Sequence, residues 1–280
     1  MKSIIRFFIK SNVWVAFCTL GLTATSEILL QTTNYQISQF VFCATIFTYN
    51  FQRIIRVKKG QEHARKKWLD KNRTVVYFLM FFAVVMSSYH FFNFKSSTQI
   101  AILFAGGLSV LYPFGLRRIP FVKIFIISFV WAISTMLLLV LENNISISEH
   151  IILHLVSRFL FVFAITIPFD IRDLKYDADD LKTIPLFFGF EKAKWIAIFS
   201  VFICMIIATF HQLQNEINLS NFLALILLYF LASVLIKKSD QNNSEMYFSF
   251  WVESLSIFSY LFLVILLLIF QIRLLTFTAL

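Results

Sequence analysis

The chain has 280 residues, of which 59% are hydrophobic and only 14% are charged. Soluble domains contain about 45–50% apolar and about 25% charged residues, so this composition excludes an ordinary soluble protein. The apolar excess runs along the whole sequence, which a single membrane anchor does not explain. The net charge of +10 has no soluble domain to present it, so we expect no nucleic-acid partner. We expect one polytopic membrane domain, residues 1–280.

Apolar runs of membrane-crossing length recur nine times. A helix needs about 20 mostly apolar residues to cross about 30 Å of hydrocarbon. The runs are too long and too continuous for the strands of a barrel. The expected fold is therefore an all-α bundle of nine transmembrane helices. Their expected limits are residues 11–31, 35–56, 73–93, 97–114, 120–141, 149–169, 193–211, 219–236 and 251–272.

The Lys and Arg residues gather at one end of these spans. Of the 25, all but three fall on the side of the N-terminus; Lys95 and Arg273 fall on the opposite side, and Arg158 lies within the sixth span. Because basic loops remain in the cytosol, we expect the N-terminus to be cytosolic in a bacterial-type inner (plasma) membrane. The basic face is also expected to attract anionic membrane lipids.

Two features along the chain predict local structure. The stretch KKGQEHARKKWLDKNR, residues 58–73, is interpreted as a short basic helix on the membrane surface with Trp68 at headgroup level; a solvated basic loop fits the composition equally well. An ionisable residue within a span normally faces the interior and has a partner. Since Glu27 lies at a similar depth in the first span, we expect it to pair with Arg158.

A cluster of carboxylates ends the sixth span. Asp170, Asp173 and Asp177 are spaced i, i+3, i+7, which places them on one face of a helix. Three like charges on one face repel one another, and a divalent cation relieves that repulsion. Mg²⁺ takes one or two carboxylates together with the phosphate oxygens of a substrate. The pattern indicates a metal site for an anionic substrate with a lipid tail, although a polar helix end explains it equally simply.

The stretch RDLKYDADDLKTIPLFFG, residues 172–189, resembles the second signature of the UbiA family of intramembrane prenyltransferases. That signature runs approximately R-D-x-x-x-D, then K/R-T-L-P and a short apolar run ending in Gly. The stretch LYPFGLRRIPFVKIF, residues 111–125, resembles the family's Tyr-Pro stretch between the fourth and fifth helices. The residues that match the second signature in order and spacing are Arg172, Asp173, Asp177, Lys182, Thr183, Pro185 and Gly189.

The resemblance implies a bundle with a central cavity open to the cytosolic side. Family members bind a polyprenyl diphosphate through Mg²⁺, ionise it and transfer the allylic carbon to a lipophilic acceptor, often an aromatic ring or quinone precursor. The resemblance makes Asp173 and Asp177 catalytic metal ligands, with Asp170 as a third candidate. The expected substrate contacts near them are Tyr112, Arg117, Arg118, Lys123 and Lys182. Alternatively, the two arginines simply anchor their loop.

The family's first signature, N-D-x-x-D-x-x-x-D, is degenerate in NFQRIIRVK, residues 50–58, where three aspartates are lost. Asn50 is kept, and we expect Asn50 and Arg53 to face Asp173 across the cavity and bind the substrate. Arg53 would then be a catalytic clamp on the diphosphate, because an arginine fork suits phosphate oxygens. Three interpretations stay open: an enzyme with one Mg²⁺ on Asp173 and Asp177, a non-catalytic binder of a lipid diphosphate or related isoprenoid, and a structural remnant.

Overall fold

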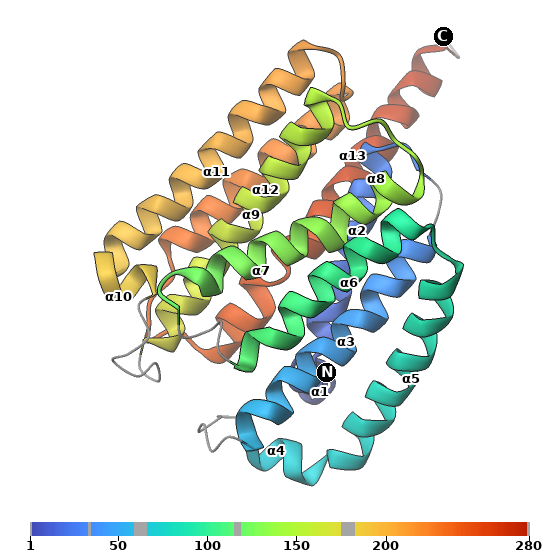
Figure 1. Ribbon diagram of the computed structural model, residues 1–280. Helices are drawn as coiled ribbons and strands as arrows, with labels where there is room; N and C mark the ends of the chain where they lie inside the picture. Colours follow the sequence, from blue (N-terminus) through green and yellow to red (C-terminus); the bar gives the residue numbers. More distant parts are fainter. Residues whose placement is uncertain (1, 33–34, 59–65, 115–118, 175–182, 279–280) are drawn as a thin grey trace.

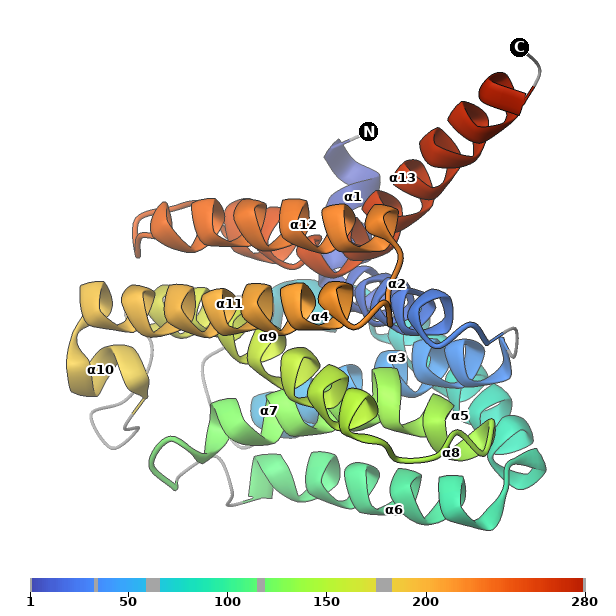
Figure 2. The same ribbon diagram turned by 90° about the horizontal axis from the view of Figure 1, so that it is seen from above.

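The computed structural model describes residues 2–32, 35–58, 66–114, 119–174 and 183–278, and over these residues it is helical, without strands. Long helices run up and down the molecule (Figures 1 and 2). The helices are α1 (Lys2–Lys10), α2 (Val13–Leu29), α3 (Gln36–Lys58), α4 (Lys66–Lys71), α5 (Arg73–Asn93), α6 (Ser96–Leu111), α7 (Val122–Ala132), α8 (Leu138–Glu142), α9 (Glu149–Asp173), α10 (Ile184–Phe188), α11 (Phe190–Leu213), α12 (Leu219–Lys237) and α13 (Leu255–Thr278).

Each of the nine expected segments falls largely on helix where the structure describes it. By length and composition, seven helical segments of the described chain suit a membrane crossing, or up to eight if the bent pair α1 and α2 forms one span. Helix α3 is not among them, because its many polar residues, such as Gln36, Gln39 and Asn50, make it too hydrophilic. The number of nine crossings stays a prediction. The seven segments are Arg73–Asn93, Ser96–Phe114, Val122–Glu142, Glu149–Asp173, Phe190–Leu213, Leu219–Lys237 and Tyr247–Ile272.

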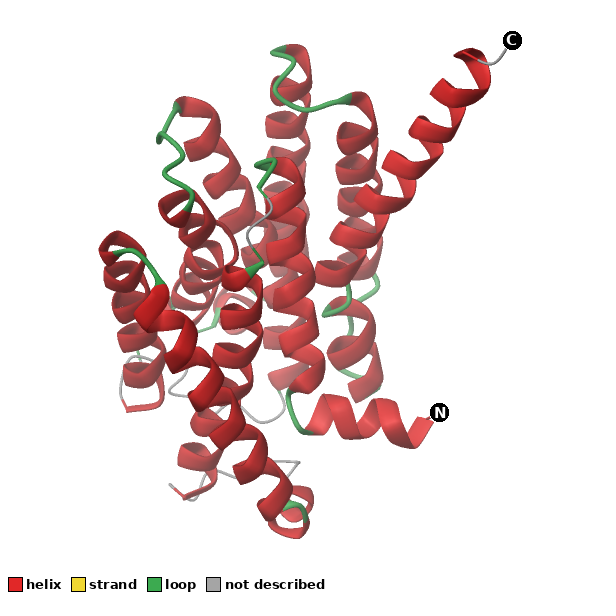
Figure 3. Ribbon diagram, turned by 90° about the vertical axis from the view of Figure 1, so that its right-hand side faces the viewer, coloured by secondary structure: helices red, strands yellow, loops and turns green. Residues whose placement is uncertain are grey.

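The first helix lies across the end of the bundle instead of along it (Figure 3). Helices α1 and α2 meet at 80°, and Asn12 turns the chain between them with a φ of 63°. The ring of Phe7 in α1 contacts that of Trp68 in α4 edge-on, with centroids 5.8 Å apart. Two short basic helices therefore meet at one end, and α4 agrees with the helix expected within residues 58–73.

Two π-helical turns interrupt the long helices. Segment η3 (Ile133–Leu137) joins α7 to α8, and η4 (Tyr247–Val252) precedes α13. Such turns are often found at functional sites because they re-aim the side chains around them. A short turn of 3₁₀ helix, η1 (Tyr112–Phe114), comes directly after α6.

The main core lies among α2, α9, α11, α12 and the start of α13. Helix α2 approaches α13 very closely at Gly21: a Cβ there would lie 3.0 Å from the Cα of Ile257 and 3.2 Å from the carbonyl oxygen of Ser256. The ends of α3, α6 and α9 and the starts of α7 and α11 lie at the same end of the bundle as α4 (Figure 1). The fold thus collects the residues next to the sequence motifs at one end.

Candidate functional site

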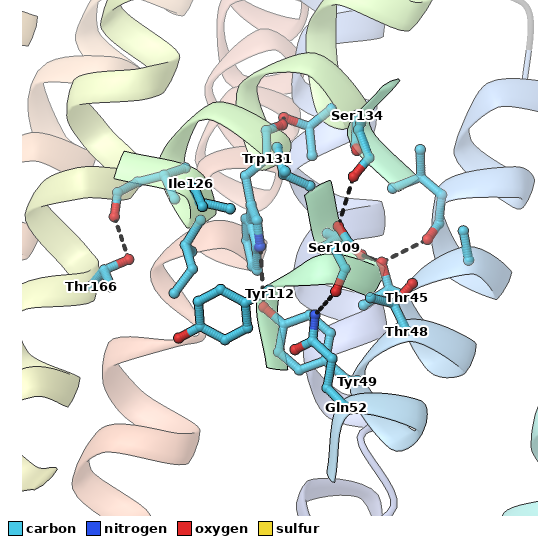
Figure 4. Close-up of a pocket in the computed structure, with 18 of the residues that line it drawn as sticks. Thr45, Thr48, Tyr49, Gln52, Ser109, Tyr112, Ile126, Trp131, Ser134 and Thr166 are labelled. Atoms are coloured by element: carbon cyan, nitrogen blue, oxygen red, sulfur yellow. Dashed lines mark hydrogen bonds between the residues drawn. The ribbon is translucent and has the colours of Figure 1, made fainter. Parts of the chain in front are cut away.

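A cavity of about 300 Å³ lies among α3, α6, α7 and α9. Its charged end consists of Arg56, Tyr112, Lys123, Arg172, Asp173 and Glu253, which come from helix ends or from beside η4. Further in, the wall is apolar and hydroxyl-rich, with threonines and serines of α3, α6 and η3 among aliphatic and aromatic side chains (Figure 4). The deeper apolar residues include Phe40, Val41, Ile102, Ile127, Val130, Leu138, Val162 and Ile165.

Lys123 reaches two acidic residues of α9. Its Nζ lies 2.5 Å from Oδ1 of Asp170 and 3.9 Å from Oδ2 of Asp173. Side chains three residues apart on a helix are neighbours, so this shared contact agrees with the expected common face. Asp170 is 1% exposed and lies outside the cavity wall, whereas Asp173 lines the cavity. Asp170 therefore forms its ion pair with Lys123 outside the cavity wall, whereas Asp173 presents its carboxylate to the cavity.

Arg172 ties the same carboxylate to the neighbouring π-helical turn. Its Nε donates to Oδ1 of Asp173 at 2.7 Å, and its Nη1 donates to the hydroxyl of Ser249 in η4 at 3.5 Å. The guanidinium carbon also lies 5.2 Å from the ring centroid of Phe169 and 6.0 Å from that of Phe248. Charge, hydrogen bonds and ring contacts thus fix the position of Asp173 at the end of α9.

The structure does not place Asn50 and Arg53 opposite Asp173, and neither lines the cavity. Asn50 accepts from Nδ2 of Asn12 at 2.9 Å and donates to the carbonyl oxygen of Ser11 at 3.0 Å. Arg53 donates to the carbonyl oxygen of Lys10 at 2.7 Å and to Oδ1 of Asn12 at 2.5 Å. Both side chains therefore hold the turn between α1 and α2.

The cavity face of α3 carries Tyr49, Gln52 and Arg56 instead. Their i, i+3, i+7 spacing places them on one side of the helix, rotated away from residues 50 and 53. The hydroxyl of Tyr49 accepts from Nε1 of Trp131 at 3.1 Å, and Gln52 Nε2 donates to the carbonyl oxygen of Ser109 at 2.8 Å (Figure 4). The same spacing rule applied to all polar residues of α3 would have identified this second face.

The remaining expected residues divide into two groups. Tyr112 and Lys123 line the cavity, as expected for substrate contacts. Asp177, Arg117, Arg118 and Lys182 lie outside the residues that the structure describes.

The expected pair between Arg158 and Glu27 was wrong. Arg158 does reach the first long helix, but it donates to the carbonyl oxygen of Leu22 and to the hydroxyl of Ser26, each at 2.8 Å. Glu27 accepts from the hydroxyl of Ser38 in α3 at 2.6 Å. One residue further along the helix, a side chain points about 100° away, so Glu27 faces α3 while Ser26 faces α9.

The donor chemistry of the charged end fits a metal ion that also binds a phosphate. Among the described residues, no three His, Cys, Asp or Glu side chains are grouped to hold a metal ion by themselves. Mg²⁺ usually retains several non-protein ligands and takes only one or two carboxylates beside the phosphates of a substrate. Asp173, placed on the cavity wall, supplies one carboxylate of this kind.

The fold has relatives among solved structures, all at low sequence identity. A UbiA homologue from Aeropyrum pernix K1 in its apo form has a TM-score of 0.71 and 10% identity over 91% of this chain and 98% of the other. A UbiA homologue from Archaeoglobus fulgidus bound to GPP and Mg²⁺ has a TM-score of 0.65 and 13% identity over 92% and 97%. A structure of digeranylgeranylglyceryl phosphate synthase has a TM-score of 0.60 and 12% identity over 95% and 98%.

Sequence comparison agrees with the fold. No curated protein matches the sequence. The profile of the UbiA prenyltransferase family, however, matches residues 13–255, which include every residue that lines the cavity except Ser256, both π-helical turns and the carboxylate cluster. The chain therefore belongs to the UbiA prenyltransferase family.

Proposed function

We propose that the chain is an intramembrane prenyltransferase that moves the prenyl group of a polyprenyl diphosphate to a lipophilic, aromatic or quinone-precursor acceptor. The observation that carries the proposal is the continuity of the cavity, which joins a charged end to an apolar interior. An amphiphilic substrate fits such a cavity, with its diphosphate at the charged end and its tail inside. Family membership and the binding of GPP and Mg²⁺ by the Archaeoglobus fulgidus homologue support it.

The charged end suits a diphosphate. Arg56, Lys123 and Arg172 bring three cations to it, against the carboxylates of Asp173 and Glu253. Hydrogen bonds from a cation to a phosphate oxygen are short and about twice as strong as neutral ones. We assign to Arg56 the clamp that the sequence suggested for Arg53, because Arg56 is the arginine of α3 on the cavity wall. These cations would stabilise the negative charge that gathers on the departing diphosphate.

The metal ligands proposed are Asp173 and Asp177, with Asp170 acting through its contact with Lys123. Mg²⁺, when bound, supplies positive charge to the diphosphate oxygens. Asp173 is held in place for this role by Arg172 and Lys123. Arg117, Arg118 and Lys182 are proposed as further contacts to the diphosphate from the resemblance alone.

The interior of the cavity is suited to the prenyl group. Its aliphatic wall would exclude water from a cationic allylic carbon, and the rings of Tyr49, Tyr112 and Trp131 would face that charge with their π-systems. The hydroxyls of Thr45, Thr48 and neighbouring serines offer hydrogen bonds to an acceptor with polar substituents.

A second candidate is a protein that binds the lipid diphosphate without transferring it. The α3 wall favours it, because that wall presents an arginine and an amide and no carboxylate to a metal ion.

Radiolabelled geranyl diphosphate with the purified protein separates the two candidates. We expect Mg²⁺-dependent transfer of label to an acceptor in an extract of quinone precursors. Asp173→Asn should lower the rate by about 100-fold or more, as loss of one stabilising group typically does. Asp240→Asn is the control, because Asp240 lies between α12 and η4, away from the cavity wall. Tight binding without labelled product would establish the second candidate, and absence of binding would overturn both.

A further inference from the structure

A second, much smaller cavity surrounds Arg158. It has a volume of about 30 Å³ and shares no lining residue with the larger cavity. It lies among α2, α9, α11, α12 and α13, toward the half of α9 that begins at Glu149. Its wall is unusually polar for the interior of a membrane bundle. The polar lining residues are Thr25, His154, Ser157, Arg158, His211, Tyr229 and Ser259.

Arg158 places a positive charge in the smaller cavity, and no acidic side chain among the described residues pairs with it. Its side chain is 7% exposed, and its hydrogen bonds go to neutral oxygens of Leu22 and Ser26. Among the described residues no ion pair includes Arg158, and Glu27 is turned to Ser38. A buried charge within a transmembrane bundle is costly unless an opposite charge balances it. The guanidinium has five N–H groups, and these two bonds use only part of that capacity.

The other walls add hydrogen-bond donors. The hydroxyls of Ser157 and Tyr229 lie 3.1 Å apart, so one of the two protons is available to a third group. His211 is 1% exposed, and neither of its ring nitrogens has a hydrogen-bond partner in the described protein. Its ring stacks on that of His154 with centroids 3.9 Å apart. A cation does not suit this site, because Arg158 would repel it.

We propose that this cavity binds one small monovalent inorganic anion of the size of chloride. The anion would balance the charge of Arg158 and accept hydrogen bonds from the guanidinium, a hydroxyl and an imidazole N–H. The space is more than one water-sized group needs, so chloride and bromide fit. A single negative charge balances Arg158, whereas a divalent sulfate would leave an excess negative charge in the interior of the bundle. Since α2, α9 and α12 all contact the site, the anion would stabilise the packing of the bundle. The proposal is independent of the prenyltransferase function.

Thermal unfolding of the purified protein in detergent tests the proposal. We expect the melting temperature to rise saturably when sodium chloride replaces sodium gluconate at constant ionic strength, because a ligand that binds only the folded state stabilises it. Bromide should act like chloride, and sulfate should not. Arg158→Gln should abolish the effect, and Arg73→Gln, which removes an exposed arginine at the start of α5, should retain it.

If Arg158→Gln does not fold, a direct measurement of chloride binding to the wild-type protein still tests the proposal. Equilibrium dialysis with ³⁶Cl⁻ should give one chloride bound per wild-type chain, and Tyr229→Phe should weaken the affinity at least several-fold. Equal melting temperatures in chloride and gluconate, with no chloride retained in dialysis, would mean that the cavity holds water only and would overturn the proposal. Chloride dependence that persists in Arg158→Gln would overturn it as well, by locating the anion elsewhere.

Discussion

At the scale of single residues, the function of α3 depends on which side chain faces which neighbour. Arg53 and Arg56 lie less than one turn apart, yet the first holds the turn between α1 and α2 and the second lines the cavity. A shift of three residues on a helix changes the direction of a side chain by about 60°. This rotation separates a structural arginine from one that we propose to contact the diphosphate.

The two arginines should respond differently to the same substitution. Arg56→Gln should weaken the binding of geranyl diphosphate about 10-fold, the equivalent of one charge-assisted hydrogen bond. Arg53→Gln should lower stability by about 1–3 kcal/mol, because buried acceptors on Lys10 and Asn12 lose their donor. Titration calorimetry and thermal unfolding measure the two effects. The reverse pattern would show that Arg53 is the clamp.

Lys123 offers a test of the buried pair behind the cavity. Lys123→Met should destabilise the protein by about 3–5 kcal/mol, because it leaves Asp170 buried without its cation. The double variant with Asp170→Asn should recover most of that loss, since it removes the unpaired charge. Denaturant unfolding of Lys123→Met, Asp170→Asn and the double variant measures the coupling. If the losses simply add, the contact between Lys123 and Asp170 contributes no stability.

At the scale of elements, the cavity is shaped by interruptions in otherwise regular helices. Segment η3 places Ser134 and Thr135 on the cavity wall, and η4 leads directly into Glu253, which lines the charged end. A π-helical turn adds a residue to the helix and rotates the side chains beyond it. The close approach of α2 to α13 at Gly21 holds the second of these interruptions against the bundle.

A pair of glycine substitutions tests that close approach. Gly21→Ala should cost about 1–3 kcal/mol, because its Cβ would collide with backbone atoms of Ser256 and Ile257 that cannot move independently. Gly107→Ala should be neutral or stabilise by up to about 1 kcal/mol, since a Cβ there meets nothing within 4 Å and alanine favours helix. Thermal unfolding compares them. Equal effects would indicate that α2 and α13 are not tightly packed.

At the scale of the whole molecule, the basic helices α1 and α4 and the charged end of the cavity lie at the same end of the bundle. Lys66, Lys67 and Lys71 of α4 are at this end, as are α1 and the end of α9 (Figure 1). The distribution of Lys and Arg predicts that this end is cytosolic. A diphosphate headgroup would then enter the site from the cytosolic side.

Cysteine labelling tests this orientation. The three native cysteines are buried, so the background should be low. In intact cells, Ser244→Cys between α12 and η4 should resist a membrane-impermeant maleimide, whereas Gln214→Cys at the opposite end of the bundle should react. Both should react after the membrane is permeabilised. The opposite result in intact cells would place the N-terminus outside.

The lengths of the helices were predictable from sequence, and their rotations were not. The third expected span, 73–93, has the same limits as α5 because apolar length is a local property of the chain. The sixth expected span ends at residue 169, and helix α9 continues beyond it to Asp173, as the helical spacing of Asp170 and Asp173 predicted. The partners of Arg158 and the direction of Arg53 depend on how neighbouring helices are rotated, which the motifs and apolar runs do not specify.

The turn after the first helix has a practical consequence for handling the protein. Asn12 donates to Asn50 and accepts from Arg53. These hydrogen bonds couple the position of α1, which lies across the end of the bundle, to that of α3, which lines the cavity. A bulky N-terminal fusion, or immobilisation through the N-terminus, would displace α1 and, through Asn12, the part of α3 that carries Arg56. Assays of headgroup binding should therefore use protein without an N-terminal fusion or attachment.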